Sequence, residues 1–90
     1  MTKKEYKQYK RKMLLAGVYF GMILDTFEVE SMDAEQLFQL ALVLPGPYSS
    51  FEEAYDTSTH ALGFIASGKD PFLKFDSKSK TICKVKIDGN

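Results

Sequence analysis

The chain has 90 residues and 44% apolar side chains, which is enough for one small globular domain spanning residues 1–90. Twelve basic and twelve acidic residues leave no net charge, so overall charge alone would not bring the protein to nucleic acid or to an anionic membrane. The single cysteine, Cys83, excludes a disulfide framework and a thiolate zinc site, and it fits a reducing, cytoplasmic compartment.

The charges are segregated along the chain. Residues 1–12 hold six Lys or Arg and one Glu, whereas residues 13–68 hold eight acidic residues and neither Lys nor Arg. Residues 69–90 hold six Lys and three Asp. Such blocks indicate either ion pairing between the ends and the middle, or separate surfaces for separate partners.

The first expected element is a long helix over about residues 3–27, whose basic N-terminal extension is residues 1–12. Apolar side chains recur along it at alternating steps of three and four, which is typical of a coiled-coil seam. The seam consists of Tyr6, Tyr9, Met13, Ala16, Phe20, Ile23 and Phe27. A second apolar stripe lies beside it and consists of Leu15, Val18, Tyr19 and Met22. Residues 13–24 contain no charge, so we expect this half of the helix to be covered on every side.

Two glycines interrupt the apolar half of this helix. Gly17 and Gly21 lie four residues apart and therefore on one face. Each costs helix stability relative to alanine, but together they would permit the close approach of another helix.

A second helix is expected over about residues 33–44. Ser31 or Asp33 opens it, and Gln36 stands three residues after Asp33, as in a capping box. The segment Pro45-Gly46-Pro47 ends it, because proline cannot continue the helical hydrogen bonds.

A third helix is expected over about residues 50–67. Ser50 and Glu53 form a better capping box at its start, and Gly68 ends it. A helical wheel predicts one apolar face, in which Ser58 can be buried if its hydroxyl bonds to the preceding turn. That face consists of Phe51, Ala54, Tyr55, Ser58, Ala61, Leu62, Ile65 and Ala66.

The apolar period changes from about 3.6 to 2 after Pro71, which predicts a C-terminal β-hairpin. Its strands are expected over about residues 72–75 and 81–87. Cys83 alternates with lysines in the second strand, so we interpret it as a small buried hydrophobe. The predicted fold is therefore α+β and mainly helical, with three helices followed by the hairpin, which must pack on them because two strands alone are marginal.

Three side chains of the third helix are candidates for partner binding. Phe64 is a large apolar residue on the polar side of the wheel, beside His60 and Glu53. An exposed aromatic ring with a polar rim is typical of an interface anchor, although a hairpin or loop could cover the ring in the monomer. His60 and Asp56 could supply two metal ligands, but one histidine without thiolates does not make a zinc site, so we expect no metal and no cofactor.

The basic N-terminal segment supports an alternative. Lys7, Lys10, Arg11 and Lys12 alternate with two tyrosines, a pattern that can bind phosphates and stack on unpaired bases. The other interpretation is a solvated helix face.

Together with the apolar residues 13–24 that follow it, the basic segment resembles a signal peptide in composition, but no small-x-small cleavage site follows. The apolar residues span about 18 Å of helix, which is too short to cross a ~30 Å bilayer core.

The sequence contains no phosphate-binding loop, nucleophile elbow or metalloprotease motif, so we expect no enzyme. A chain of this size internalises only around 60–65% of its unfolded surface, which leaves apolar helix surface for a partner. We predict a small cytoplasmic regulatory protein, of inhibitor or modulator type, that binds another protein and pairs with itself through the first helix. Tyr6, Tyr9 and Met13 would then belong to the binding surface. Its size would suit a phage or mobile-element accessory protein, and nucleic-acid binding through the basic segment is the alternative.

Overall fold

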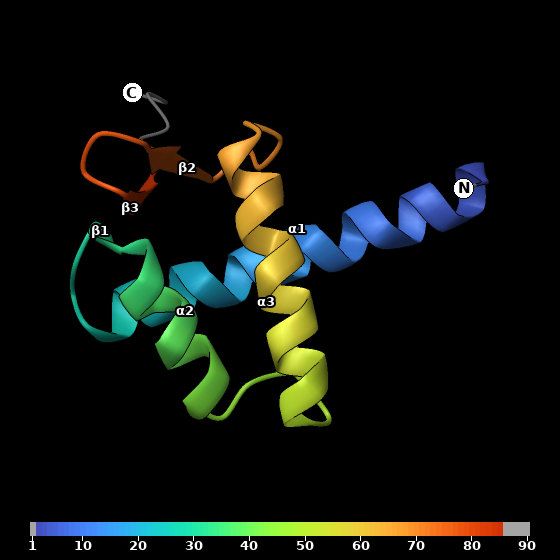
Figure 1. Cartoon of the computed structure of the whole chain (residues 1–90), viewed down its shortest axis with the longest axis horizontal. Helices are drawn as coiled ribbons and strands as arrows, with labels where there is room; N and C mark the ends of the chain where they lie inside the picture. The colour runs from blue at the N-terminus through green and yellow to red at the C-terminus, as the bar shows by residue number, and fades with distance from the viewer. Residues whose placement is uncertain (1, 86–90) are drawn as a thin grey trace.

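The computed structural model describes residues 2–85, which form three helices and a small antiparallel sheet (Figure 1). This confirms the predicted α+β, mainly helical class. The helices begin and end within one residue of the predicted bounds: they are α1 (Lys3–Thr26), α2 (Ala34–Val43) and α3 (Phe51–Ala66). The strands are β1 (Ser31–Asp33), β2 (Leu73–Asp76) and β3 (Thr81–Lys84).

The sheet contains a strand that the sequence pattern does not predict. β3 lies between β1 and β2 and is antiparallel to both, with Met32 opposite Ile82. The three residues of β1 are too few to show an alternating pattern, and their pairing partner lies far along the chain. The third strand gives the hairpin the additional pairing that two strands alone need. Residues 86 and 87, the predicted end of the last strand, lie outside the described residues.

Side-chain caps fix the starts of α2 and α3. Asp33 Oδ2 accepts a hydrogen bond from a backbone N–H of the first turn at 3.1 Å, so Asp33 rather than Ser31 is the cap of α2. Ser50 Oγ accepts in the same way from the N–H of Glu53 at 3.1 Å. The Glu53 carboxylate accepts from the N–H and the hydroxyl of Ser49, which shifts the second half of the predicted capping box by one residue.

The hydrophobic core lies where α2 and α3 pack against α1, and the sheet packs against α2 and α3 (Figure 1). Within the predicted seam, Met13, Ala16, Phe20 and Ile23 are buried there. They share the core with Leu37 and Ala41 of α2, Ala61 and Ile65 of α3, Leu73 of β2 and Ile82 of β3. The chain's own elements therefore cover the centre of the seam predicted to pair with a second copy, whereas its end residues Tyr6 and Phe27 are exposed.

The buried face of α3 also differs from the predicted one. Phe51 and Tyr55 are exposed, whereas Thr57 and Phe64 are buried. On a wheel of 100° per residue this rotates the buried face by roughly 60°. The cause is that α3 packs against α1, α2 and β2 together, and the pattern of one helix does not reveal where its neighbours lie.

One predicted hydrogen bond does not form. The hydroxyls of Ser58, Thr57 and Tyr48 are buried and make no hydrogen bond within residues 2–85, so Ser58 does not bond to its preceding turn. Burial raises the pKa of Tyr48.

A close contact with Gly17 holds the start of β2 against α1. Asp70 is buried, and its Oδ1 accepts hydrogen bonds from the N–H groups of Phe72 at 2.8 Å and Leu73 at 3.0 Å. Its other oxygen, Oδ2, would lie only 2.3 Å from a Cβ added at Gly17. Gly17 thus makes room for a carboxylate rather than for another helix. A Cβ added at Gly21 would meet nothing within 4 Å apart from its own neighbours on the helix.

Gly17→Ala should lower the free energy of unfolding, because the new methyl group meets a carboxylate that two hydrogen bonds hold in place. Overpacking of this kind costs about 1–3 kcal/mol, which exceeds the gain of roughly 0.5–1 kcal/mol from alanine in a helix. The matched control Gly21→Ala should raise the free energy of unfolding by up to about 1 kcal/mol. Urea unfolding of dilute protein, followed by circular dichroism, measures both; equal stability of the two variants would contradict the contact.

Candidate interaction surface

The outward face of α1 carries three exposed apolar side chains in one row. Leu15, Val18 and Met22 are 61%, 50% and 59% exposed, and we call them the α1 ridge. Their spacing of three and four residues makes them neighbours on the helix surface. Of the apolar residues 13–24, which we expect to be covered on every side, the single chain leaves these three uncovered. Scattered exposed apolar residues are ordinary, but a contiguous row is typical of a binding surface.

Shallow hollows border the ridge on both sides. On one side, Val18 and Met22 line a hollow together with the loop residues 45–47. On the other side, the same two residues line a hollow with the exposed ring of Phe72, and Gly21 leaves part of its floor open. A ridge between two grooves is the shape into which the side chains of another helix pack.

The N-terminal end of the ridge is basic. Lys7, Lys10 and Arg11 line one hollow together with the apolar side chains at the start of the ridge. Lys12 is exposed too, but it lies near α3, where its charge contributes to lowering the pKa of Glu53. The N-terminal turns of α1 extend beyond α3, with no other element beside them (Figure 1). Three of the four predicted nucleic-acid-binding residues are therefore brought together.

The C-terminal end of the ridge is acidic. Asp25 lines the hollow that also contains Met22, and its carboxylate forms an ion pair with Lys84 of β3. The outward face of α1 thus changes from basic through apolar to acidic along the helix.

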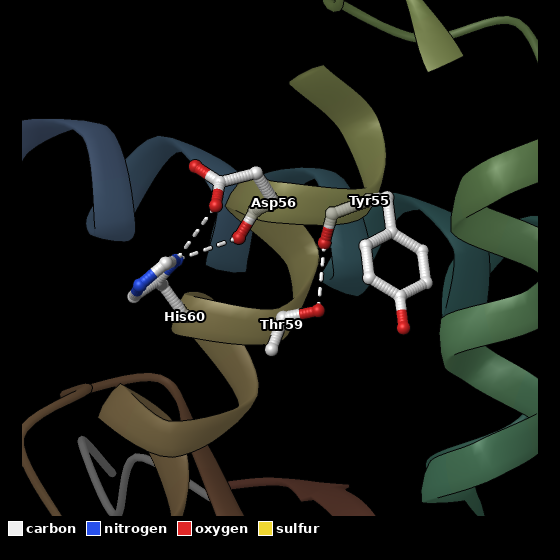
Figure 2. Close-up of polar contacts among 4 residues, drawn as sticks. All are labelled: Tyr55, Asp56, Thr59 and His60. Atoms are coloured by element: carbon white, nitrogen blue, oxygen red, sulfur yellow. Dashed lines mark hydrogen bonds and ion pairs between the residues drawn. The ribbon is translucent and has the colours of Figure 1, made fainter. Parts of the chain in front are cut away.

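The polar side of α3 makes only local contacts. His60 Nδ1 lies 2.8 Å from the backbone carbonyl oxygen of Asp56 and 3.5 Å from its Oδ1, and Thr59 donates to the carbonyl of Tyr55 at 2.7 Å (Figure 2). Each contact joins residues four apart on one helix, as is common on helix surfaces. Within residues 2–85 no group of three or more His, Cys, Asp or Glu side chains could hold a metal ion.

The predicted site around Phe64 does not exist as an exposed anchor. The ring is only 6% exposed and belongs to the core, so the alternative that the monomer covers it is correct. Glu53 is half-buried and occupied with Ser49, whereas His60 is exposed. These side chains therefore do not form an aromatic anchor with a polar rim.

The three candidates from the predicted seam also separate. Met13 is buried, Tyr9 packs partly against the core, and Tyr6 is exposed near the N-terminal end of α1. The exposed surface instead consists of Leu15, Val18 and Met22 of the second stripe, whose fourth member, Tyr19, is buried. The sequence holds a signal for this difference: the seam continues toward the N-terminus into tyrosines, whereas the stripe continues into Lys7 and Arg11.

Comparison of the chain with protein-family models, with curated proteins and with solved structures gives no match. Among the helices of residues 2–85, none has the length and apolar character needed to cross a membrane. A function for this chain therefore has to be inferred from its own surface.

The start of α3 should be sensitive to acid. The hydroxyl and the N–H of Ser49 lower the pKa of Glu53 from its ordinary value of 4.5, so the ionised carboxylate stabilises the fold above that pH. This stabilisation is lost as the pH falls through the lowered pKa. Glu53→Gln should therefore unfold at a lower temperature than wild type at pH 7, and the difference should shrink in acid.

Thermal unfolding between pH 7 and 3 measures this effect. Glu52→Gln is the matched control, because Glu52 shares the first turn of α3 but makes no hydrogen bond through its side chain within the described residues. A gap between wild type and Glu53→Gln that stays constant with pH would contradict the assignment. Hydrogen bonds from Lys78 and Ser79 also lower the pKa of Asp76. This carboxylate has the same effect on the stability of both proteins, so it does not change the difference between them.

Proposed function

We propose that this chain is a small cytoplasmic regulatory protein, of inhibitor or modulator type, that binds another protein through the α1 ridge and catalyses no reaction. The observation that carries the proposal is the row of Leu15, Val18 and Met22, which stays exposed although the core of the chain is filled without it. Grooves on both sides give this row the shape of a helix-binding surface.

The ridge offers enough apolar surface to support specific binding. Burial of one Val, Leu or Met side chain contributes about 1.5–3 kcal/mol, so the three residues together with Phe72 offer several kcal/mol to an interface. Association and side-chain ordering consume part of this gain. An apolar centre with charged groups at its edges is the usual composition of protein interfaces, in which a few central residues supply most of the affinity.

Nucleic-acid binding is the second candidate function. Lys7, Lys10 and Arg11 share one hollow on a helix end that extends away from the molecule, and Tyr6 beside them is exposed. The α1 face as a whole favours a protein partner, because its apolar centre makes no phosphate contacts and the cation at its far end, Lys84, is paired with Asp25.

Site-specific photo-cross-linking in the native cells tests the main proposal. A photoreactive residue at Val18 should cross-link a distinct protein, and the additional substitution Met22→Glu should abolish the product, because it places a charge in the apolar row. A photoreactive residue at Val43 is the matched control: this side chain is 72% exposed on α2 and lies outside the ridge. Products that contain only nucleic acid, or equal products at positions 18 and 43, would overturn the proposal.

A salt titration tests the second candidate. If the basic end of α1 binds nucleic acid, the affinity for a single-stranded oligonucleotide should fall steeply between about 50 and 200 mM salt. The triple substitution Lys7→Glu, Lys10→Glu and Arg11→Glu should abolish that binding, and Met22→Glu should leave it unchanged. We expect the wild-type protein to show no such salt-dependent binding in fluorescence anisotropy.

A further inference from the structure

The outward face of α1 is complementary to itself when two copies run in opposite directions. Lys4, Arg11, Val18 and Asp25 are each seven residues apart, so they lie along nearly the same face of the helix. Lys4 and Arg11 precede the apolar centre, and Asp25 follows it. A second copy turned end to end therefore brings its acidic end to the basic end of the first.

We propose that the α1 ridge pairs with the α1 ridge of a second copy in an antiparallel arrangement, about a two-fold axis near Val18. This inference rests on the part of the proposed function that makes the α1 ridge a protein-binding surface, and it names a second copy as the partner. Arg11 and Asp25 are equally distant in sequence from Val18, so Arg11 of each copy lies beside Asp25 of the other.

The apolar contacts of the pair follow from the same geometry. Leu15 and Met22 lie on the same side of Val18 on the helix surface. A two-fold axis near Val18 therefore places Leu15 of each copy beside Met22 of the other. Both side chains are more than half exposed, so each is available for this contact.

The charges select the antiparallel direction. A parallel pair would place Arg11 beside Arg11 and Asp25 beside Asp25, and like charges in register repel. Lys84 contacts Oδ1 of Asp25, but a carboxylate accepts several hydrogen bonds, so this ion pair does not exclude Arg11 of the second copy. Exposed ion pairs add little affinity, so the apolar row holds the copies together and the charges set their direction.

An anionic lipid surface fits the same face less well. A helix that lies in a membrane interface carries its cations around the apolar face, whereas this face has an acidic residue at one end. If the wild-type protein remains a single chain in solution and pellets with anionic phospholipid vesicles, self-pairing is overturned in favour of lipid binding.

Disulfide cross-linking tests the arrangement in the full chain with Cys83→Ser as background. An equimolar mixture of Arg11→Cys and Asp25→Cys should form a mixed disulfide dimer several-fold more readily than either variant alone, and Val18→Cys alone should cross-link across the axis. Val43→Cys measures the background from random collisions. If Arg11→Cys alone forms a disulfide dimer in the same yield as the mixture, the antiparallel arrangement is overturned.

Sedimentation equilibrium tests the association without cysteines. Wild type should change from one chain to two as concentration rises, Leu15→Glu and Val18→Glu should remain single chains, and Val43→Glu should behave as wild type. A single-chain mass for wild type up to a concentration on the order of 1 mM overturns the inference.

The two proposals fail separately. If self-pairing is absent but a photoreactive residue at position 18 cross-links a different protein, the inference is overturned and the proposed function stands. If the second copy is the only product at position 18, the inference is supported and regulation of another protein through this face is overturned.

Discussion

The division of α1 into a buried and an exposed face determines the rest of this structure. Elements from the middle and the end of the chain pack on one side of the helix, and Gly17 lets the Asp70 carboxylate, which organises the start of β2, approach it closely. Within residues 2–85 no further helix or strand covers the opposite side. The α1 ridge is therefore a consequence of how the core is built, because its residues lie roughly opposite the buried ones on the helix.

The local features of the fold were predictable because their causes are local. Asp33 and Ser50 cap helices through backbone groups three residues away, and the prolines after α2 prevent its continuation. The features that sequence reasoning missed depend on distant partners. β1 pairs with a strand near the other end of the chain, and Phe64 is buried because α3 has neighbours on more than one side. A wheel drawn for one helix contains no information about those neighbours.

The candidate site was predictable only in part, for a related reason. The sequence places two apolar stripes on the first helix, and apolar content alone does not decide which is buried. The flanking residues do decide it: the buried seam continues into Tyr9, which packs against the core, whereas the ridge is bounded by Arg11 and Asp25, whose charges are costly to bury. Charges at heptad distances from an apolar stripe therefore indicate the solvent side, even in a helix whose centre is apolar all around.

The segregated charges gain a physical meaning from this division. Of the two interpretations that the sequence leaves open, internal pairing accounts for the contact between Lys84 and Asp25, which joins the C-terminal block to the acidic middle. It does not account for the N-terminal block, because within residues 2–85 no Lys or Arg of that block forms an ion pair. Those cations lie next to the apolar α1 ridge, whose far end is acidic. A partner that covers the ridge must therefore match a charge that changes from positive to negative along the helix. Apolar contact supplies affinity without direction, and the change of sign supplies direction with little affinity; combined on one helix face, they favour one partner orientation over its reverse.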